Sequence, residues 1–178
     1  LTVEIMSLEK IIDELSVREQ DQHLTFDLSG DELAVPVLNI REIIRYGKLT
    51  HMPMVPDFIE GVINLRGIVV PVINLASKFG LQKIETDERT CIIIMEVEIG
   101  GDHVIMGVVV DKVLQVIAIP DSEIEPSPRL GASIQTNFIK GMARTEEGFI
   151  IILDISRVLS DEEIALVSDM HQDSTVES

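Results

Sequence analysis

The chain of 178 residues has no tryptophan, one tyrosine and five phenylalanines, and it has a single cysteine. A core without large aromatic side chains must be built from isoleucine, valine, leucine and methionine, and this composition predicts many short strands. Because Cys91 has no second cysteine to pair with, no intramolecular disulfide can form, which favours a reducing, intracellular compartment. The three isoleucines that follow Cys91 predict a buried and inert thiol.

Long apolar runs and basic segments are also missing. No apolar run approaches the roughly 18 residues of a membrane-spanning helix, and the N-terminal segment is acidic, so neither a transmembrane helix nor a signal peptide is predicted. The 31 acidic residues outnumber the 14 basic ones and give a net charge of −17, which disfavours binding to nucleic acid or anionic lipid headgroups. The first residue is Leu1 rather than methionine, which predicts a piece of a longer chain.

The reactive groups that an enzyme needs are scattered through the sequence. None of the four histidines has a metal-ligand or triad spacing to Cys91 or to a carboxylate. Gly100-Gly101 predicts a turn between strands rather than a phosphate-binding loop that leads into a helix. The acidic pairs Glu146-Glu147 and Glu162-Glu163 fit solvated positions in a turn and at a helix start. The sequence therefore predicts a non-enzymatic binding module with no metal or cofactor.

The segment from Glu60 to Lys78 has the clearest local structure. Two β-rich runs flank Arg66-Gly67, which predicts a hairpin with Arg66 at its tip and Gly67 in a positive-φ position. Asn74 follows the second run and is expected to cap a short helix. Upstream, Asn39 to Ile44 fits either a helical turn or a bent strand, and we expect the helical turn.

This hairpin, cap and helix recur 80 residues later. Phe138-Ile139-Lys140-Gly141 repeats Phe58-Ile59-Glu60-Gly61, and Asp154-Ile155 repeats Asn74-Leu75. The second hairpin tip is Glu146-Glu147-Gly148, so the tip charge is reversed relative to Arg66. An internal duplication of this kind indicates two similar subdomains rather than one large sandwich.

The duplication predicts an all-β fold with short helices, made of two pseudo-repeated five-stranded β-barrels with a groove between them. The first barrel is expected mainly over residues 24–80 and the second mainly over 90–153. Both belong to one domain of residues 22–169, which closes with helices over 154–169.

Helices are predicted at both ends of the chain. Leu8, Ile11, Ile12 and Leu15 have the spacing of one helical stripe and predict an amphipathic helix, followed by a linker, within residues 1–21. A loosely attached extension is the simpler expectation. The alternative is that this stripe binds an apolar groove, in cis or on a neighbouring molecule, and regulates access to it. At the other end, Ser160 and Glu163 predict a capping box, and residues 170–178 are expected to be disordered.

Six stretches of the chain have the order and spacing of a known family. They are Asn39 to Ile44 (NIREII), Phe58 to Gly67 (FIEGVINLRG), Ile68 to Leu75 (IVVPVINL), Asp87 to Thr90 (DERT), Phe138 to Gly141 (FIKG) and Ile151 to Leu159 (IILDISRVL). From about residue 22 to 169, the chain resembles the CheW family of chemotaxis coupling proteins. The tetrapeptide NLRG alone is a weak signal, but with both FIxG segments the match is specific.

The resemblance implies two five-stranded β-barrels with a hydrophobic interface, and the function of a cytoplasmic adaptor that is monomeric on its own. Such an adaptor joins the regulatory domain of a histidine kinase to the cytoplasmic helical tip of chemoreceptors, and its partners recruit it to receptor arrays at the membrane. In the family the kinase contacts the outer edges of the barrels in alternating rings, and the receptor tip lies in the groove. An alternative is a CheW-like regulatory module of a non-chemotaxis pathway that binds only one of these partners.

The same resemblance selects the candidate partner-binding residues. They are Ile40, Glu42, Ile43, Gly61, Val62, Asn64, Leu65, Arg66, Gly67, Val108, Val116 and Gly141. The family pattern places an acid near the NLRG arginine, so Glu42 is expected to hold Arg66, although Arg66 also fits a solubilising turn charge. Some of the aliphatic candidates are expected in the core, and a subset should line the receptor site. The glycines are backbone necessities first, and they also fit places where a partner approaches closely.

Overall fold

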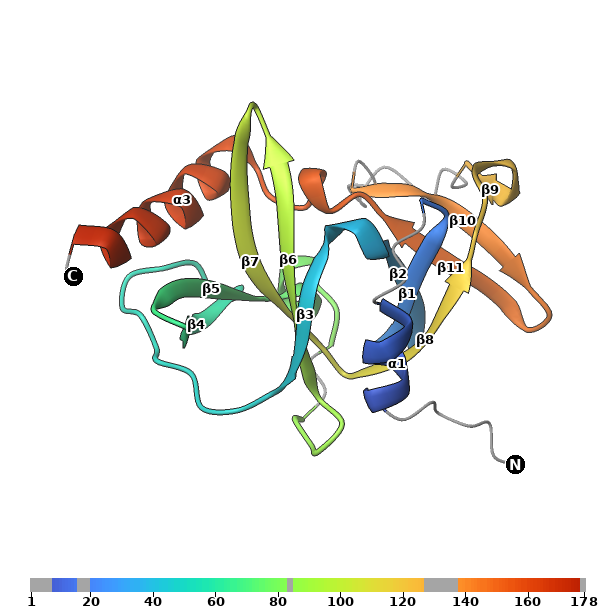
Figure 1. The fold of residues 1–178 in the computed structure, drawn as a ribbon, viewed down its shortest axis with the longest axis horizontal. Helices are drawn as coiled ribbons and strands as arrows, with labels where there is room; N and C mark the ends of the chain where they lie inside the picture. Colours follow the sequence, from blue (N-terminus) through green and yellow to red (C-terminus); the bar gives the residue numbers. More distant parts are fainter. Residues whose placement is uncertain (1–7, 16–19, 83–84, 127–137, 177–178) are drawn as a thin grey trace.

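The structure is a computed structural model that describes residues 8–15, 20–82, 85–126 and 138–176. Its described part is all-β with a few short helices, and the strands form two sheets side by side (Figure 1). Sheet A has the order β8 (Lys112–Ala118), β1 (Gln22–Leu28), β2 (Asp31–Pro36), β11 (Gly148–Leu153), β10 (Ile139–Thr145) and β9 (Ile124–Glu125). Sheet B has the order β3 (Ile40–Arg45), β6 (Cys91–Ile99), β7 (Asp102–Val110), β5 (Ile68–Asn74) and β4 (Ile59–Leu65).

In the described part of the chain, three α-helices and three 3-10 turns accompany the sheets. They are α1 (Leu8–Leu15), α2 (Leu75–Lys78) and α3 (Asp161–Val176), with 3-10 turns η1 (Val37–Asn39), η2 (Asp121–Glu123) and η3 (Ile155–Arg157). The helical turn predicted from Asn39 to Ile44 is wrong, because residues from Ile40 onward form β3 and pair with β6. Ile43 and Ile44 pair with Ile93 and Ile92 of β6, so this segment is a strand.

The duplication is confirmed in backbone detail. The N–H of Asn74 donates to the carbonyl of Phe58 at 2.7 Å, and the N–H of Asp154 donates to the carbonyl of Phe138 at 2.8 Å. The β4–β5 and β10–β11 hairpins each have a register irregularity at the residue before a glycine. These glycines, Gly61 and Gly141, are 80 residues apart. Asn74 caps α2 as predicted, since its side chain accepts a bond from the N–H of Ser77.

The predicted division into a barrel over 24–80 and another over 90–153 is wrong. Sheet B is built from β3 to β7, which are contiguous in the sequence, whereas sheet A combines β1 and β2 with β8 to β11. The first hairpin of the first repeat, β1–β2, therefore lies in the same sheet as β8, β10 and β11 of the second repeat. The first hairpin of the second repeat, β6–β7, lies in the same sheet as β3, β4 and β5 of the first. This exchange of hairpins starts at Pro36, which ends β2 and is followed by η1, so that the chain enters sheet B at β3. Sheet A also has a sixth strand, the two-residue β9, beyond the five that were predicted.

One hydrophobic cluster joins the two sheets. It contains Leu24 and Leu153 of sheet A together with Ile93 and Val108 of sheet B. The ring of Phe79, at the end of the first repeated unit, stacks on that of Phe138, at the start of the second, with centroids 4.2 Å apart and an interplanar angle of 7°. Each sheet also has a smaller hydrophobic cluster on its other face. The sheets are thus held to each other by a continuous apolar core.

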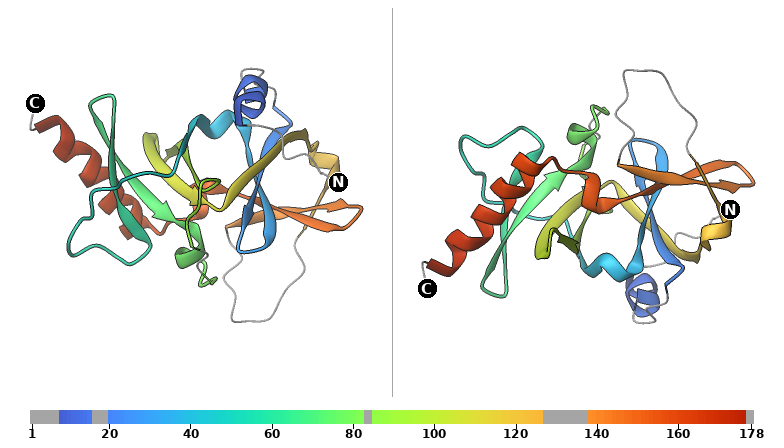
Figure 2. Two further views of the ribbon diagram at one scale, coloured as in Figure 1. Left: turned by 90° about the horizontal axis from the view of Figure 1, so that it is seen from below. Right: turned by 90° about the horizontal axis from the view of Figure 1, so that it is seen from above.

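The C-terminal helix α3 runs along sheet B, where it contacts β5 and β7 (Figure 2). Its capping box is confirmed, because Ser160 N–H donates to Glu163 at 2.7 Å and Glu163 N–H donates to Ser160 Oγ at 3.2 Å. Lys78 anchors the same carboxylate at 2.6 Å. The predicted disorder from residue 170 is wrong up to Val176, because the helix continues that far without a glycine or proline to stop it.

Candidate partner-binding surfaces

The hairpin tip between β4 and β5 carries the predicted pair of Arg66 and Glu42. Arg66 and Gly67 both have positive φ, 52° and 87°, as in the turn that matches the twist of a two-residue hairpin. The side chain of Asn64 accepts a hydrogen bond from Gly67 N–H at 2.9 Å and fixes the turn. The Arg66 guanidinium donates to the carboxylate of Glu42 on β3, so this pair links the hairpin tip to the edge strand of sheet B.

The geometry of this pair suits a binding surface better than a stabilising contact. The Arg66 side chain is 73% exposed and that of Glu42 is 28% exposed. An ion pair of this exposure contributes about 0 to 1 kcal/mol to stability. The pair instead holds the guanidinium in one place beside Leu65, which is half-buried, and Ile68, which is 40% exposed.

The corresponding positions of sheet A carry different charges. The edge strands β3 and β8 occupy corresponding places in the two sheets, and each has one register irregularity, after Ile40 in β3 and after Val113 in β8. Superposing these irregularities aligns Glu42 with Gln115 and Ile43 with Val116. At the hairpin tip, the 80-residue offset aligns Arg66 with Glu146. The two ends of the molecule therefore share a backbone plan but differ in charge, with one basic and one acidic tip.

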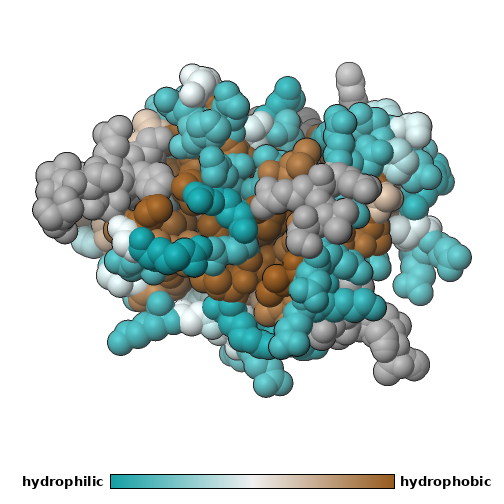
Figure 3. Space-filling model, in the orientation of Figure 1, coloured by the Kyte–Doolittle hydropathy of each residue, from teal (hydrophilic) through white to brown (hydrophobic). Residues whose placement is uncertain are grey.

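Most of the aliphatic candidates lie inside the structure. Ile40, Ile43, Val62 and Val108 are 2%, 6%, 9% and 1% exposed, whereas Val116, like Leu65, is half-buried. The four buried residues belong to the cluster that joins the sheets, and Val116 packs against it. On the face of Figure 3, apolar atoms are gathered at the centre, within a polar surround. A partner can contact the buried side chains only if something that covers them moves.

Gly61 and Gly141 are required by the chain itself. A Cβ atom at Gly61 would lie 2.4 Å from the carbonyl oxygen of Thr50, and one at Gly141 would lie 2.6 Å from that of Glu125. In contrast, a Cβ at Gly67 would meet open space. The close approach at both repeat positions is to the protein's own backbone, so these two glycines have a structural role.

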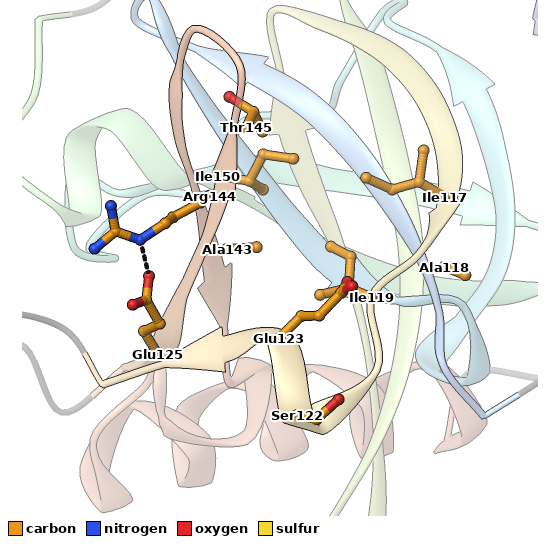
Figure 4. Close-up of a pocket in the computed structure, with 10 residues that line it drawn as sticks. All are labelled: Ile117, Ala118, Ile119, Ser122, Glu123, Glu125, Ala143, Arg144, Thr145 and Ile150. Carbon is orange, nitrogen blue, oxygen red and sulfur yellow. Dashed lines mark hydrogen bonds and ion pairs between the residues drawn. The ribbon is translucent and has the colours of Figure 1, made fainter.

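A cavity of about 500 Å³ opens at the outer end of sheet A. Ile117, Ile119 and Ile150 point into it, and Arg144 at its rim turns away to bind Glu125 at 2.7 Å (Figure 4). The 80-residue offset aligns Ala143 of this cavity with Ile63, which packs within the corresponding cluster of sheet B. A smaller side chain at this position accounts for open space on one sheet only. Sequence reasoning missed this cavity and its ion pair, because the pairing of the two-residue strand β9 with β10 brings Glu125 and Arg144 together and was not predicted.

A polar network that the sequence did not suggest ties the β3–β4 connection to the hairpin. Tyr46 O–H donates to one carboxylate oxygen of Glu60 at 2.9 Å, and the Asn74 amide donates to the other at 2.6 Å. His51 lies 3.0 Å from the Glu60 carbonyl through its Nδ1 atom. Burial, together with the bond to Glu60, raises the pKa of Tyr46 to about 12.

Titration of Tyr46 tests this network directly, because it is the only tyrosine and the chain has no tryptophan. We expect the phenolate absorbance of the folded protein to appear with a midpoint near pH 12. A tyrosine in the denatured chain titrates at about pH 10. Because the folded-state pKa is the higher one, the stabilisation is complete below the unfolded-state pKa and is lost as the pH rises through the folded-state value. A midpoint near 10 in the folded protein would contradict the network.

Two buried titratable groups have packing roles. Cys91 is 3% exposed, which confirms its predicted burial, and this burial raises the pKa of its thiol. Burial lowers the pKa of His23, whose Nδ1 atom contacts the Asp21 carbonyl at 2.8 Å. Among the described residues, no three histidine, cysteine or carboxylate side chains converge as metal ligands. Within those residues, no helix has the length and apolar character to span a membrane.

Comparison with known proteins assigns these features to one family. The family model of the CheW-like domain matches residues 22–163. The chain is 36% identical to the chemotaxis protein CheW of Klebsiella aerogenes over 149 residues, which is 84% of this chain and 87% of the relative. It is 33% identical to CheW of Bacillus subtilis over 147 residues, covering 82% and 91%, and 32% identical to protein FrzA of Myxococcus xanthus over 144 residues, covering 80% and 87%.

A solved structure agrees with this assignment. The scaffolding protein TtCheW of Thermoanaerobacter tengcongensis has a TM-score of 0.70 and 34% identity, over 80% of this chain and 89% of that chain. The residues that the family model matches, 22–163, hold both sheets. The predicted resemblance is confirmed, and the chain belongs to the CheW-like domain family of chemotaxis scaffold proteins.

Proposed function

We propose that this protein is a non-enzymatic adaptor that couples chemoreceptors to the regulatory domain of a histidine kinase. The observation that carries the proposal is the Arg66–Glu42 pair, which fixes a basic tip on a family scaffold whose net charge is −17. A positioned charge on an exposed tip favours one orientation of a partner and increases its rate of association.

The two ends of the molecule offer two different contacts. The basic tip has the exposed Ile68 beside it, and the acidic tip has Phe149, which is 48% exposed and lies 5.4 Å from the Arg144 guanidinium. Each end therefore places an exposed hydrophobic side chain next to charged groups. Many protein interfaces have this composition, with an apolar centre and a polar rim. Opposite charges let a kinase domain distinguish the ends, which suits an adaptor that alternates with its partner in a ring.

The proposed receptor contact involves one edge strand of each sheet, β3 and β8. Val116 on β8 is half-buried and is a direct candidate for contact with an apolar helix, whereas Ile40 and Ile43 on β3 are buried and become candidates only when what covers them moves. Val62 and Val108 support these edges from inside the core. The protein needs no membrane segment of its own for this role, because its partners bring it to the receptor array in the cytoplasm.

Binding measurements with purified partners test the proposal. We expect the chain to bind the regulatory domain of a chemotaxis histidine kinase and the cytoplasmic tip of a chemoreceptor, each detected by calorimetry, and to form a ternary complex in gel filtration. Binding of neither partner would reject the adaptor function. Binding of one partner alone would instead support a regulatory module that serves another pathway.

A further inference from the structure

Helix α1 is docked on the protein by one aliphatic side. Ile11 is fully buried, and Leu8 and Leu15 pack against the same core cluster, whereas Ile12 is 45% exposed. A helix of eight residues is marginal on its own in water, so tertiary contacts must hold it. The prediction of a loosely attached extension is therefore wrong for these residues, and the predicted stripe does bind an apolar surface in cis.

The surface beneath α1 is the edge of sheet A. The helix contacts β8, which has β1 as its neighbour in the sheet and lies at the end of the strand order (Figure 1). On β8, Val113 is 6% exposed and Val116 is half-buried, and both pack with the cluster that includes Ile11. The aliphatic residues of this edge are thus closed to solvent in part by a helix of the same chain.

The edge under α1 is the counterpart of the edge of sheet B. β3 also lies at the end of its strand order, and the matching register irregularities align Ile40 with Val113 and Ile43 with Val116. Three of these four residues, Ile40, Ile43 and Val116, are the proposed contacts with a receptor helix, and Val113 lies beside Val116 on the same edge strand. α1 lies on the β8 edge, so an amphipathic helix of the same chain already occupies part of the proposed receptor-binding surface.

We infer that α1 is an internal competitor of the receptor helix, occupying the β8 edge and leaving it when the receptor tip binds. The inference rests on the proposed function and adds regulation to the same site. The ligand that α1 mimics is an amphipathic helix with an aliphatic stripe, which is the class of partner that a hydrophobic groove accepts. Release of α1 exposes Val113 and Val116 for such a helix.

The size of the effect follows from the population of the open form. The apparent dissociation constant equals the intrinsic one divided by the fraction of molecules that can bind. If α1 is docked in about nine molecules of ten, its removal strengthens receptor binding about tenfold. Kinase binding at the β4–β5 tip is expected to stay unchanged, because α1 contacts β8 on the other sheet.

The test uses the full chain with a charge placed in the docked side of α1. We expect Ile11→Glu to bind a purified chemoreceptor cytoplasmic tip about tenfold more tightly than the parent. Ile12→Glu is the matched control, because the same change one residue later falls on an exposed side chain. Thermal melting and binding of the kinase regulatory domain show that each variant is folded.

Hydrogen exchange on the unmodified chain gives a second measurement. Saturating receptor tip should remove the protection of amides in residues 8–15, while saturating kinase domain should leave it in place. Equal receptor affinity of Ile11→Glu and the parent, or protection of α1 that persists in the receptor complex, would overturn the inference alone. Failure of every variant to bind the receptor tip would overturn the proposed function and the inference with it. Loss of α1 protection on dilution without a partner would place the helix on a neighbouring copy and overturn the cis arrangement.

Discussion

The Arg66→Glu variant is expected to bind the kinase regulatory domain about 30-fold more weakly, the loss that a contact of about 2 kcal/mol gives. The substitution places two carboxylates next to each other at positions that now form an ion pair, so it both repels Glu42 and reverses the charge of the tip. Stability is expected to change by at most about 1 kcal/mol, because the pair is exposed. Calorimetric titration and a melting curve on the same sample measure both effects.

Two further variants separate positioning from direct contact. Glu42→Ala keeps Arg66 but frees its side chain, so a positioning role predicts weaker binding here as well. In the doubly substituted Glu42→Arg, Arg66→Glu protein the pair is rebuilt with reversed charges, and recovery of binding would show that the fixed hairpin is what the partner recognises. Arg89→Glu, at an exposed arginine that pairs with Asp87, is the charge-matched control. Full kinase binding by both Arg66→Glu and Glu42→Ala would reject the assigned role of the pair.

The Gly61→Ala variant is expected to lose about 3 kcal/mol of stability, at the upper end of what overpacking in a filled site costs. The added Cβ would lie 2.4 Å from the Thr50 carbonyl oxygen, and this backbone atom cannot rotate away as a side chain would. The Thr50 carbonyl also accepts the N–H of Val62 at 2.8 Å, so moving it disrupts a backbone bond. The melting temperature should fall by roughly 6 to 12 °C for a chain of this length.

Other glycines in the same fold provide the comparison. Gly141→Ala should be destabilised to a similar degree, because its added Cβ would lie 2.5 Å from Ile124 Cγ2 and 2.6 Å from the Glu125 carbonyl oxygen. Gly47→Ala should melt like the parent, since its Cβ would meet open space. A Gly61→Ala protein as stable as the Gly47→Ala protein would show that the β3–β4 connection yields to the methyl group.

Local signals in the sequence were enough for the hairpins, the caps and the repeat. Gly67 follows Arg66 between two β-rich runs, and Asn74 precedes a short helix, so turn and cap chemistry over a few residues specify the β4–β5 unit. The same is true of Ser160 and Glu163 at the start of α3. Each of these features depends on contacts between residues that are close in the chain, which explains why they could be predicted.

Features that depend on distant partners were missed or were predicted wrongly. The segment from Ile40 to Arg45 has apolar residues that suit either a helical turn or a strand, and its pairing with β6, about fifty residues away, decides for the strand. The cavity near Ala143 exists because of one smaller side chain among residues from several strands. The burial of Ile11 depends on β8, which lies about a hundred residues further along the chain.

The sequence by itself determined the family, the duplicated β plan and the Arg66–Glu42 candidate, because the repeat offset and the family motifs are properties of residue order. Only the tertiary structure decided which hairpin joins which sheet, which candidate side chains are reachable and where α1 lies. The physical reason is that these arrangements depend on contacts between segments that are far apart in the chain, such as β1 with β8 and β5 with β7. The choice depends on the turn after Pro36 and on the packing of the shared core, which form only when distant segments meet.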